Sequence, residues 1–147
     1  MNDYAKGGRF VIGILVVTHS GLGEALIEAA ESILDEPLEA ATAVSVDLTQ
    51  SAEHMREKIN TGIKTVNQGG GVLILTDMFG GTPSNISLSF LEEGRIEVLT
   101  GVNLPVVIRA ANMRKDMNLN DLAERLQAYG RKSISLASGV LKGNKKS

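Results

Sequence analysis

Residues 10–23 read Phe-Val-Ile-Gly-Ile-Leu-Val-Val-Thr-His-Ser-Gly-Leu-Gly, an apolar run that ends in three polar residues and a glycine-flanked turn. A short β-branched apolar run bounded by a turn is typical of a strand that is buried on both faces of a parallel sheet. We therefore predict a strand over residues 10–17. Because ligands bind outside the carboxyl ends of the strands in open parallel sheets, His19 is the first candidate functional residue.

Three further apolar segments repeat this strand pattern, with helical spacing between them. The predicted strands are 42–48, 72–76 and 96–100, and the predicted helices are 21–35, 51–66, 82–94, 106–113 and 119–129. Strands that alternate with helices predict an α/β three-layer sandwich, in which helices cover both faces of a mainly parallel four-stranded sheet.

The two ends of the chain differ from this pattern. Residues 133–137 alternate polar and apolar side chains, which predicts a fifth, short edge strand with one solvated face. We expect residues 1–9 to be a flexible leader, residues 10–140 to be one domain, and residues 141–147 to be a basic disordered tail.

Two polar residues, His19 and Asp77, each follow an apolar strand. If the chain winds outward from the first strand in both directions, strands 1 and 3 are neighbours at the switch point of the sheet, and these two side chains face one crevice. A carboxylate that accepts a proton from one imidazole nitrogen fixes the tautomer and leaves the other nitrogen free as a nucleophile. The pair is therefore predicted to be catalytic.

A glycine pair follows Asp77 and precedes a predicted helix start, where Thr82 is the expected N-cap and proline the first helical residue. Gly80 and Gly81 let the backbone approach an anion closely, and the amides and dipole of a helix start favour negative charge. These features favour transient phosphorylation of His19. The structural alternative is that His19 and Asp77 only cap their turns.

Other kinds of site are poorly supported. The glycines of Gly21-Leu22-Gly23 follow a strand, and Asp47 could bind a ribose, but Leu26 is too large for a dinucleotide fingerprint. Residues 69–71 are three glycines without the Gly-Lys-Ser/Thr of a P-loop. His19, Asp77 and Asp47 lack the local spacing of a metal site, so no metal and no cofactor is expected. No Gly-x-Ser-x-Gly elbow is present, and His54 is expected on a solvated helix face.

The composition excludes several classes of partner. The chain has 147 residues, a net charge of −2, five aromatic residues and no cysteine. It offers no basic surface with interleaved aromatic residues for nucleic acid, no disulfide and no cysteine-ligated metal. Its longest apolar run is too short to span a bilayer, so we expect a cytoplasmic protein without direct membrane insertion.

Three motifs carry a resemblance to a known family. They are Val-Val-Thr-His-Ser-Gly-Leu-Gly, Leu-Thr-Asp-Met-Phe-Gly-Gly-Thr-Pro-Ser-Asn and Thr-Gly-Val-Asn-Leu-Pro. In this order, over residues 10–140, they resemble the mannose-family enzyme IIA domain of the sugar phosphotransferase system. The resemblance implies four parallel strands in the order 2-1-3-4, a fifth antiparallel strand that is often exchanged, and a homodimer.

The resemblance also implies a role for each site residue. His19 would accept a phosphoryl group from the histidine-containing phosphocarrier protein and pass it to an enzyme IIB. Asp77 would orient the ring so that Nε2 reacts, and Gly80, Gly81 and Thr82 would contact the phosphoryl oxygens. Sugar-transporting members often carry a fused IIB domain, whereas here a short basic tail follows, so we expect the IIB acceptor to be a separate protein.

Two alternatives accompany this interpretation. A freestanding IIA could be a regulatory phosphorelay module that acts by phosphorylation-dependent protein binding, without sugar transport. The related phosphotransfer subunit of dihydroxyacetone kinase has the same fold and a strand-1 histidine, but the Gly-Gly-Thr-Pro-Ser-Asn segment argues against it.

Overall fold

The computed structural model describes residues 11–143, and its centre is a four-stranded sheet. The strands are β1 (Gly13–His19), β2 (Ala41–Val46), β3 (Val72–Thr76) and β4 (Ile96–Thr100), in the order β2-β1-β3-β4. All three neighbouring pairs are parallel. The predicted strand order and direction are confirmed.

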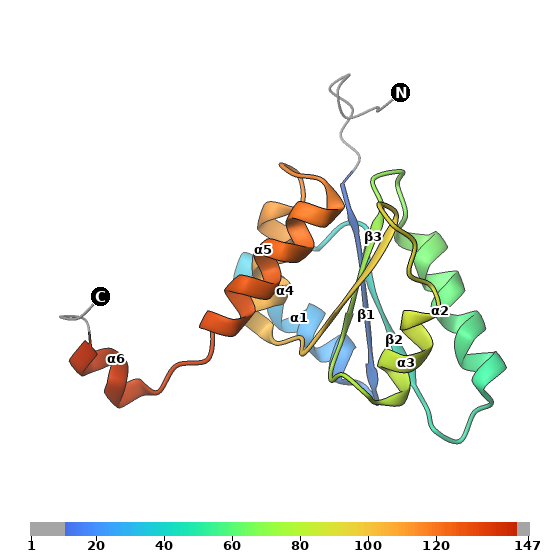
Figure 1. Ribbon diagram of the computed structural model, residues 1–147, viewed down its shortest axis with the longest axis horizontal. Coiled ribbons are helices and arrows are strands. Elements are labelled where there is room, and N and C mark those ends of the chain that lie inside the picture. The colour runs from blue at the N-terminus through green and yellow to red at the C-terminus, as the bar shows by residue number, and fades with distance from the viewer. Residues whose placement is uncertain (1–10, 144–147) are drawn as a thin grey trace.

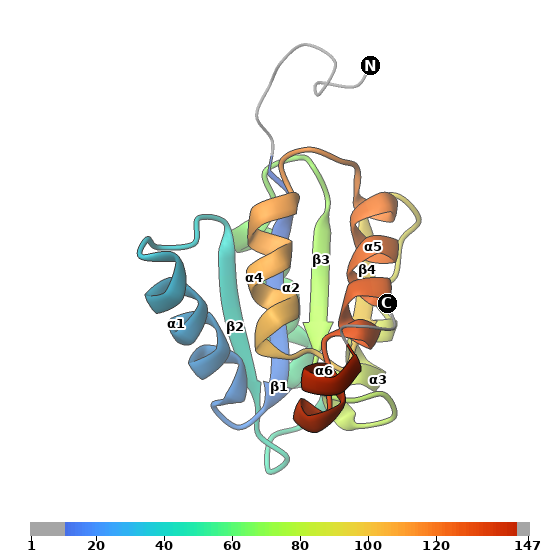
Figure 2. The same ribbon diagram turned by 90° about the vertical axis from the view of Figure 1, so that its left-hand side faces the viewer.

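Helices cover both faces of this sheet. Helices α1 (Leu22–Leu34), α4 (Leu104–Met113) and α5 (Leu119–Lys132) lie on one face, and α2 (Ala52–Val66) and α3 (Thr82–Leu88) lie on the other (Figure 1). A view turned by 90° looks onto the face that α1, α4 and α5 cover (Figure 2). The predicted α/β three-layer sandwich is confirmed.

Strand β1 is the centre of the core because its side chains alternate between the two faces. Ile14 and Val16 join the apolar cluster under α1, α4 and α5, whereas Leu15 and Val17 join the cluster under α2 and α3. All four side chains are fully buried. A strand buried on both faces, as the sequence predicts, therefore carries His19 at its end.

Some element boundaries differ from the prediction. The first strand continues to His19 instead of ending at residue 17. Helix α3 ends at Leu88 instead of near residue 94, because the amide of Phe90 bonds to the carbonyl of Ser87 and a turn follows. Helix α4 begins at Leu104, two residues early, because the Asn103 side chain accepts a hydrogen bond from Val106 N–H.

The predicted fifth strand at residues 133–137 is wrong for this single chain. Residues 134–136 have no regular structure, and helix α6 (Ala137–Gly143) follows them. The segment extends away from the sheet (Figure 1), and no strand among residues 11–143 pairs with it. Ile134 and Leu136 are consequently 83% and 77% exposed.

The predicted leader and tail fall mainly on residues 1–9 and 144–147, which lie outside the described residues. Residues 141–143, assigned to the tail from sequence, are the last turn of α6.

Candidate functional site

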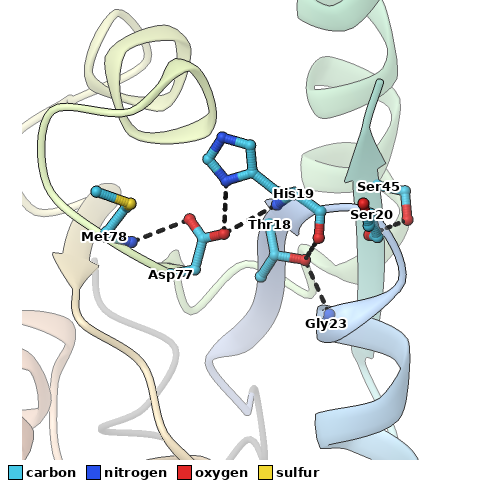
Figure 3. A network of polar contacts seen from close by, with 7 residues as sticks. All are labelled: Thr18, His19, Ser20, Gly23, Ser45, Asp77 and Met78. Atoms are coloured by element: carbon cyan, nitrogen blue, oxygen red, sulfur yellow. Dashed lines mark hydrogen bonds and ion pairs between the residues drawn. The ribbon is translucent and has the colours of Figure 1, made fainter. Parts of the chain in front are cut away.

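Strands β1 and β3 bring His19 and Asp77 together across 58 positions of sequence. His19 is the last residue of β1, and Asp77 directly follows β3, its neighbour in the sheet. Nδ1 of the ring lies 2.8 Å from Asp77 Oδ2 (Figure 3). The two residues predicted from sequence thus form one hydrogen-bonded pair at the carboxyl edge of the sheet.

This contact determines which ring nitrogen is available. An ionised carboxylate only accepts hydrogen bonds, so His19 Nδ1 carries the proton and Nε2 of the neutral ring keeps its lone pair. Nε2 points away from Asp77 (Figure 3). The His19 side chain is 36% exposed, against 12% for Asp77. A partly exposed nucleophilic nitrogen is thus oriented by a largely buried carboxylate.

Asp77 is held as an anion by its surroundings. Partial burial raises its pKa, but hydrogen bonds from the His19 backbone, the His19 ring and the Met78 backbone outweigh that effect. The pKa of Asp77 therefore lies below its ordinary value of 3.8. The two backbone N–H groups, from His19 and Met78, each lie 2.9 Å from a carboxylate oxygen.

Gly81 lies beside the imidazole ring of His19. A Cβ added to Gly81 would lie 3.1 Å from His19 Cε1 and 3.7 Å from Nε2, so only glycine leaves this space open. Gly80 is exposed and has a φ of 91°. Gly81, and not Thr82 as predicted, is the N-cap of α3; it is extended and offers no side chain for capping.

Helix α3 begins beside the reactive nitrogen. Thr82 is its first residue and is half-buried, and a proline follows in the first turn. The first amides of a helix have no intrahelical acceptor. Within residues 11–143, Gly81 and Thr82 donate no backbone hydrogen bond to a protein oxygen. These donors are available to an anion close to His19.

An open crevice of about 510 Å³ adjoins the other side of His19 and is lined by Ser20, Gly21, Glu24 and residues 45–48. Asp47 lies in this lining, but Thr49 donates to its carboxylate through both N–H and Oγ1, and these bonds lower the Asp47 pKa. No group of three metal-binding side chains occurs within the described part of the chain. A second groove, of about 530 Å³, lies along β2, and His19 does not line it.

One polar residue of the site was missed from sequence. Thr18 is fully buried, and its Oγ1 accepts a hydrogen bond of 2.8 Å from Gly23 N–H (Figure 3). The available signal was a threonine at the end of an otherwise apolar strand, directly before His19.

His54 is exposed on α2, as expected for a solvated histidine. From residue 11 to residue 143, no helix is long and apolar enough to cross a membrane.

The fold and the site define a class of protein: a parallel α/β domain that presents one carboxylate-oriented histidine at the switch point of its sheet. Comparison with known proteins identifies the family within this class. The family described as "PTS system fructose IIA component" matches residues 13–127, and the chain belongs to this family. The resemblance to mannose-family IIA domains is thereby confirmed, and the chain is a component of a phosphotransferase system.

Individual relatives agree with this family. The fructose-specific EIIA component of Bacillus subtilis is 30% identical over 129 residues, which cover 87% of this chain and 88% of that protein. The mannose-specific EIIAB component of Escherichia coli K12 is 32% identical over 106 residues, which cover 71% of this chain and 32% of that protein.

A solved structure has the same fold. It is the IIA protein associated with the fucose utilization operon of Streptococcus pneumoniae, with a TM-score of 0.79 at 20% identity. The match covers 91% of this chain and 98% of that one.

Proposed function

We propose that this chain is a phosphocarrier that accepts a phosphoryl group on Nε2 of His19 and passes it on. The observation that carries the proposal is the 2.8 Å contact between His19 Nδ1 and Asp77, which leaves Nε2 nucleophilic and partly exposed. In the first step, the bond between phosphorus and the donor's histidine nitrogen breaks as the bond to Nε2 forms, and Nδ1 keeps its proton. The second step is the same exchange with an acceptor.

The residues beside Nε2 suit a phosphoryl group. The proposed contacts are the backbone amides of Gly80, Gly81 and Thr82, with the start of α3 favouring the added negative charge. The ionised Asp77 stabilises the ring while it carries the phosphoryl group, because phosphorylation at Nε2 of the Nδ1–H tautomer gives the ring a positive charge.

The partners of the reaction are proteins, and an exposed apolar surface near His19 supports this. Leu22, Leu48, Met78 and Phe79 are 46%, 63%, 55% and 72% exposed. They belong to segments that follow β1, β2 and β3, at the same edge of the sheet as His19. Large apolar side chains around a reactive group are typical of a protein-docking surface. The proposed donor is the histidine-containing phosphocarrier protein.

The proposed acceptor is a separate enzyme IIB of a sugar transporter, and the proposed location is the cytoplasm. The name of one relative supports a role in a sugar phosphotransferase system, since the Bacillus subtilis protein is called a PTS fructose-specific EIIA component and is matched over 88% of its length. The alternative of a regulatory module uses the same phosphorylated histidine and differs in the fate of the phosphoryl group.

We further propose a homodimer in which residues 133–137 of each chain add to the sheet of the other. The supporting observation is the exposure of Ile134 and Leu136, whose alternation is that of a half-buried strand without a neighbour. Strand β4 is at the edge of the sheet and can accept another strand.

The test is transfer of labelled phosphate from phosphoenolpyruvate through enzyme I and the phosphocarrier protein. We expect acid-labile, alkali-stable label that is lost in His19→Ala and kept in the matched control His54→Ala, whose histidine is exposed on α2. Absence of label in the unmodified chain, or label that persists in His19→Ala, would overturn the proposal. Label that no IIB accepts would favour the regulatory module.

A further inference from the structure

The turn between β1 and α1 contains a buried hydroxyl that hydrogen-bonds both to the reactive residue and to the helix that follows. Thr18 Oγ1 accepts a hydrogen bond of 2.8 Å from Gly23 N–H and donates one of 3.1 Å to the carbonyl of His19 (Figure 3). Thr18 itself is fully buried. One side chain therefore links the backbone of His19 to the first turn of α1.

Helix α1 needs this hydroxyl because its own N-cap has no side chain. Gly21 is the N-cap, and no side-chain capping bond is formed there. Gly23 packs so closely on the sheet that an added Cβ would lie 3.1 Å from Val16 O and 3.3 Å from Ala43 Cβ. Its N–H is therefore shielded from water, and Thr18 supplies the acceptor that a buried donor requires.

The same turn contains a strained residue. Ser20 has a φ of 50°, in the left-handed region that a residue with a side chain rarely adopts. The Ser45 hydroxyl of β2 donates to the Ser20 carbonyl, so the turn is held from β2 as well as from Thr18. Such strain persists only where surrounding contacts determine the conformation.

We propose that Thr18 is a positioning residue that fixes the reactive ring of His19. Asp77 holds the backbone N–H and the ring of His19, and Thr18 holds its carbonyl, so the residue is fixed at three points. This inference rests on the proposed function, since it concerns phosphoryl transfer through Nε2. Thr18 acts through His19 and does not itself meet the phosphoryl group.

The variant Thr18→Val keeps the size and branching of the side chain and removes both hydrogen bonds. Without them the turn can relax, and Nε2 is no longer held at one place beside Gly81. We expect the maximal rate of phosphorylation to fall at least about tenfold, because small misplacements of a reacting atom are costly. The KM for the phosphocarrier protein should stay the same, since the exposed apolar residues around the site are unchanged.

The chain offers a matched control in Thr76, which precedes Asp77 as Thr18 precedes His19. Thr76 is equally buried, but its Oγ1 has no hydrogen-bond partner among residues 11–143. Thr76→Val should leave the rate of phosphorylation unchanged. Thr18→Ser, which restores the hydroxyl without the methyl group, should recover most of the rate that Thr18→Val loses.

A second readout needs no phosphoryl donor. The ¹⁵N chemical shifts of the His19 ring report its tautomer, and the exposed His54 provides an internal reference. We expect the Nδ1–H form to dominate in the unmodified chain and in Thr76→Val. In Thr18→Val the His19 ring should show a larger share of the Nε2–H form, with the His54 ring unchanged.

The outcomes separate the two proposals. An unmodified chain that takes no label contradicts the proposed function, whatever the variants do. If the unmodified chain is labelled, the positioning role is tested by comparing the two valine variants. Equal rates of phosphorylation and equal tautomer populations in Thr18→Val and Thr76→Val would overturn it. If Thr18→Val does not fold, Thr18→Cys gives the same comparison, because a thiol has similar size and is a weak hydrogen bonder.

Discussion

Oδ2 of Asp77 accepts two hydrogen bonds from the same residue, His19: one of 2.8 Å involving ring Nδ1 and one of 2.9 Å from the backbone N–H. The first fixes the ring and the second fixes the end of strand β1. One carboxylate therefore sets the tautomer of the ring and its position relative to the sheet. Because Asp77 makes both contacts, substituting it tests whether a carboxylate orients the His19 ring.

Asp77→Asn should keep the fold and slow phosphorylation by about two orders of magnitude or more. The asparagine amide can donate to His19 Nδ1, which moves the ring proton to Nε2 and removes the nucleophilic lone pair. Single-turnover kinetics with the phosphorylated donor measure this effect. Equal rates in Asp77→Asn and the unmodified chain would argue against an orienting carboxylate.

Asp77 should also make stability depend on pH. Its pKa in the folded chain is below the ordinary value of 3.8, so its contribution is complete above 3.8 and is lost as the pH falls through the folded pKa. The unmodified chain should exceed Asp77→Asn in free energy of unfolding by about 1–2 kcal/mol near pH 5. The difference should shrink as the pH falls below 3.8, as denaturant titrations can establish. A difference that is constant over this range would exclude the linkage.

Gly81→Ala should impair transfer without unfolding the protein. Gly81 has a φ of −86°, which alanine adopts freely, but its Cβ would lie 3.1 Å from His19 Cε1. We expect phosphorylation to slow about tenfold while stability changes by less than about 0.5 kcal/mol.

Gly80→Ala is the contrasting variant. Apart from its two chain neighbours, no described residue has an atom within 4 Å of its added Cβ, but its φ of 91° strains alanine. A loss of about 1–2 kcal/mol in stability is expected. If Gly81→Ala loses as much stability as Gly80→Ala, its effect on transfer does not come from crowding of the ring.

Replacing Ile134 and Leu136 together with serine should convert the proposed dimer to a monomer. These side chains are 83% and 77% exposed in the single chain and would be covered in a strand that joins a partner's sheet. Light scattering gives the mass directly. The control is Leu141→Ser, which is equally exposed at 78% but lies outside the proposed strand. A monomeric unmodified chain would contradict the dimer.

The central part of this architecture is predictable because it depends on local pattern. Four apolar strands separated by helices limit the fold to a parallel α/β sheet, and the switch-point rule then brings His19 next to Asp77. His19 is the last residue of β1 and Asp77 directly follows β3, so no long-range information is needed to place them at one edge. The structure confirms this pairing at 2.8 Å.

The missed features depend on tertiary contacts. The role of Thr18 requires the close approach of Gly23 to β1 and β2, which no local pattern encodes. Thr82 has the better intrinsic propensity for an N-cap, yet the N-cap of α3 is Gly81 and Thr82 is the first helical residue. Residues 133–137 have the alternation of a strand, but an alternating segment becomes a strand only beside another one.

The most direct test of the central claim is to identify the atom that carries the phosphoryl group. The uniformly ¹⁵N-labelled chain is phosphorylated through enzyme I and the phosphocarrier protein, and ³¹P–¹⁵N coupling is measured for both histidine rings. Because Asp77 engages Nδ1, the account predicts phosphorus on Nε2 of His19 alone. Phosphorus on Nδ1 of His19, on His54 or on any other residue would contradict it.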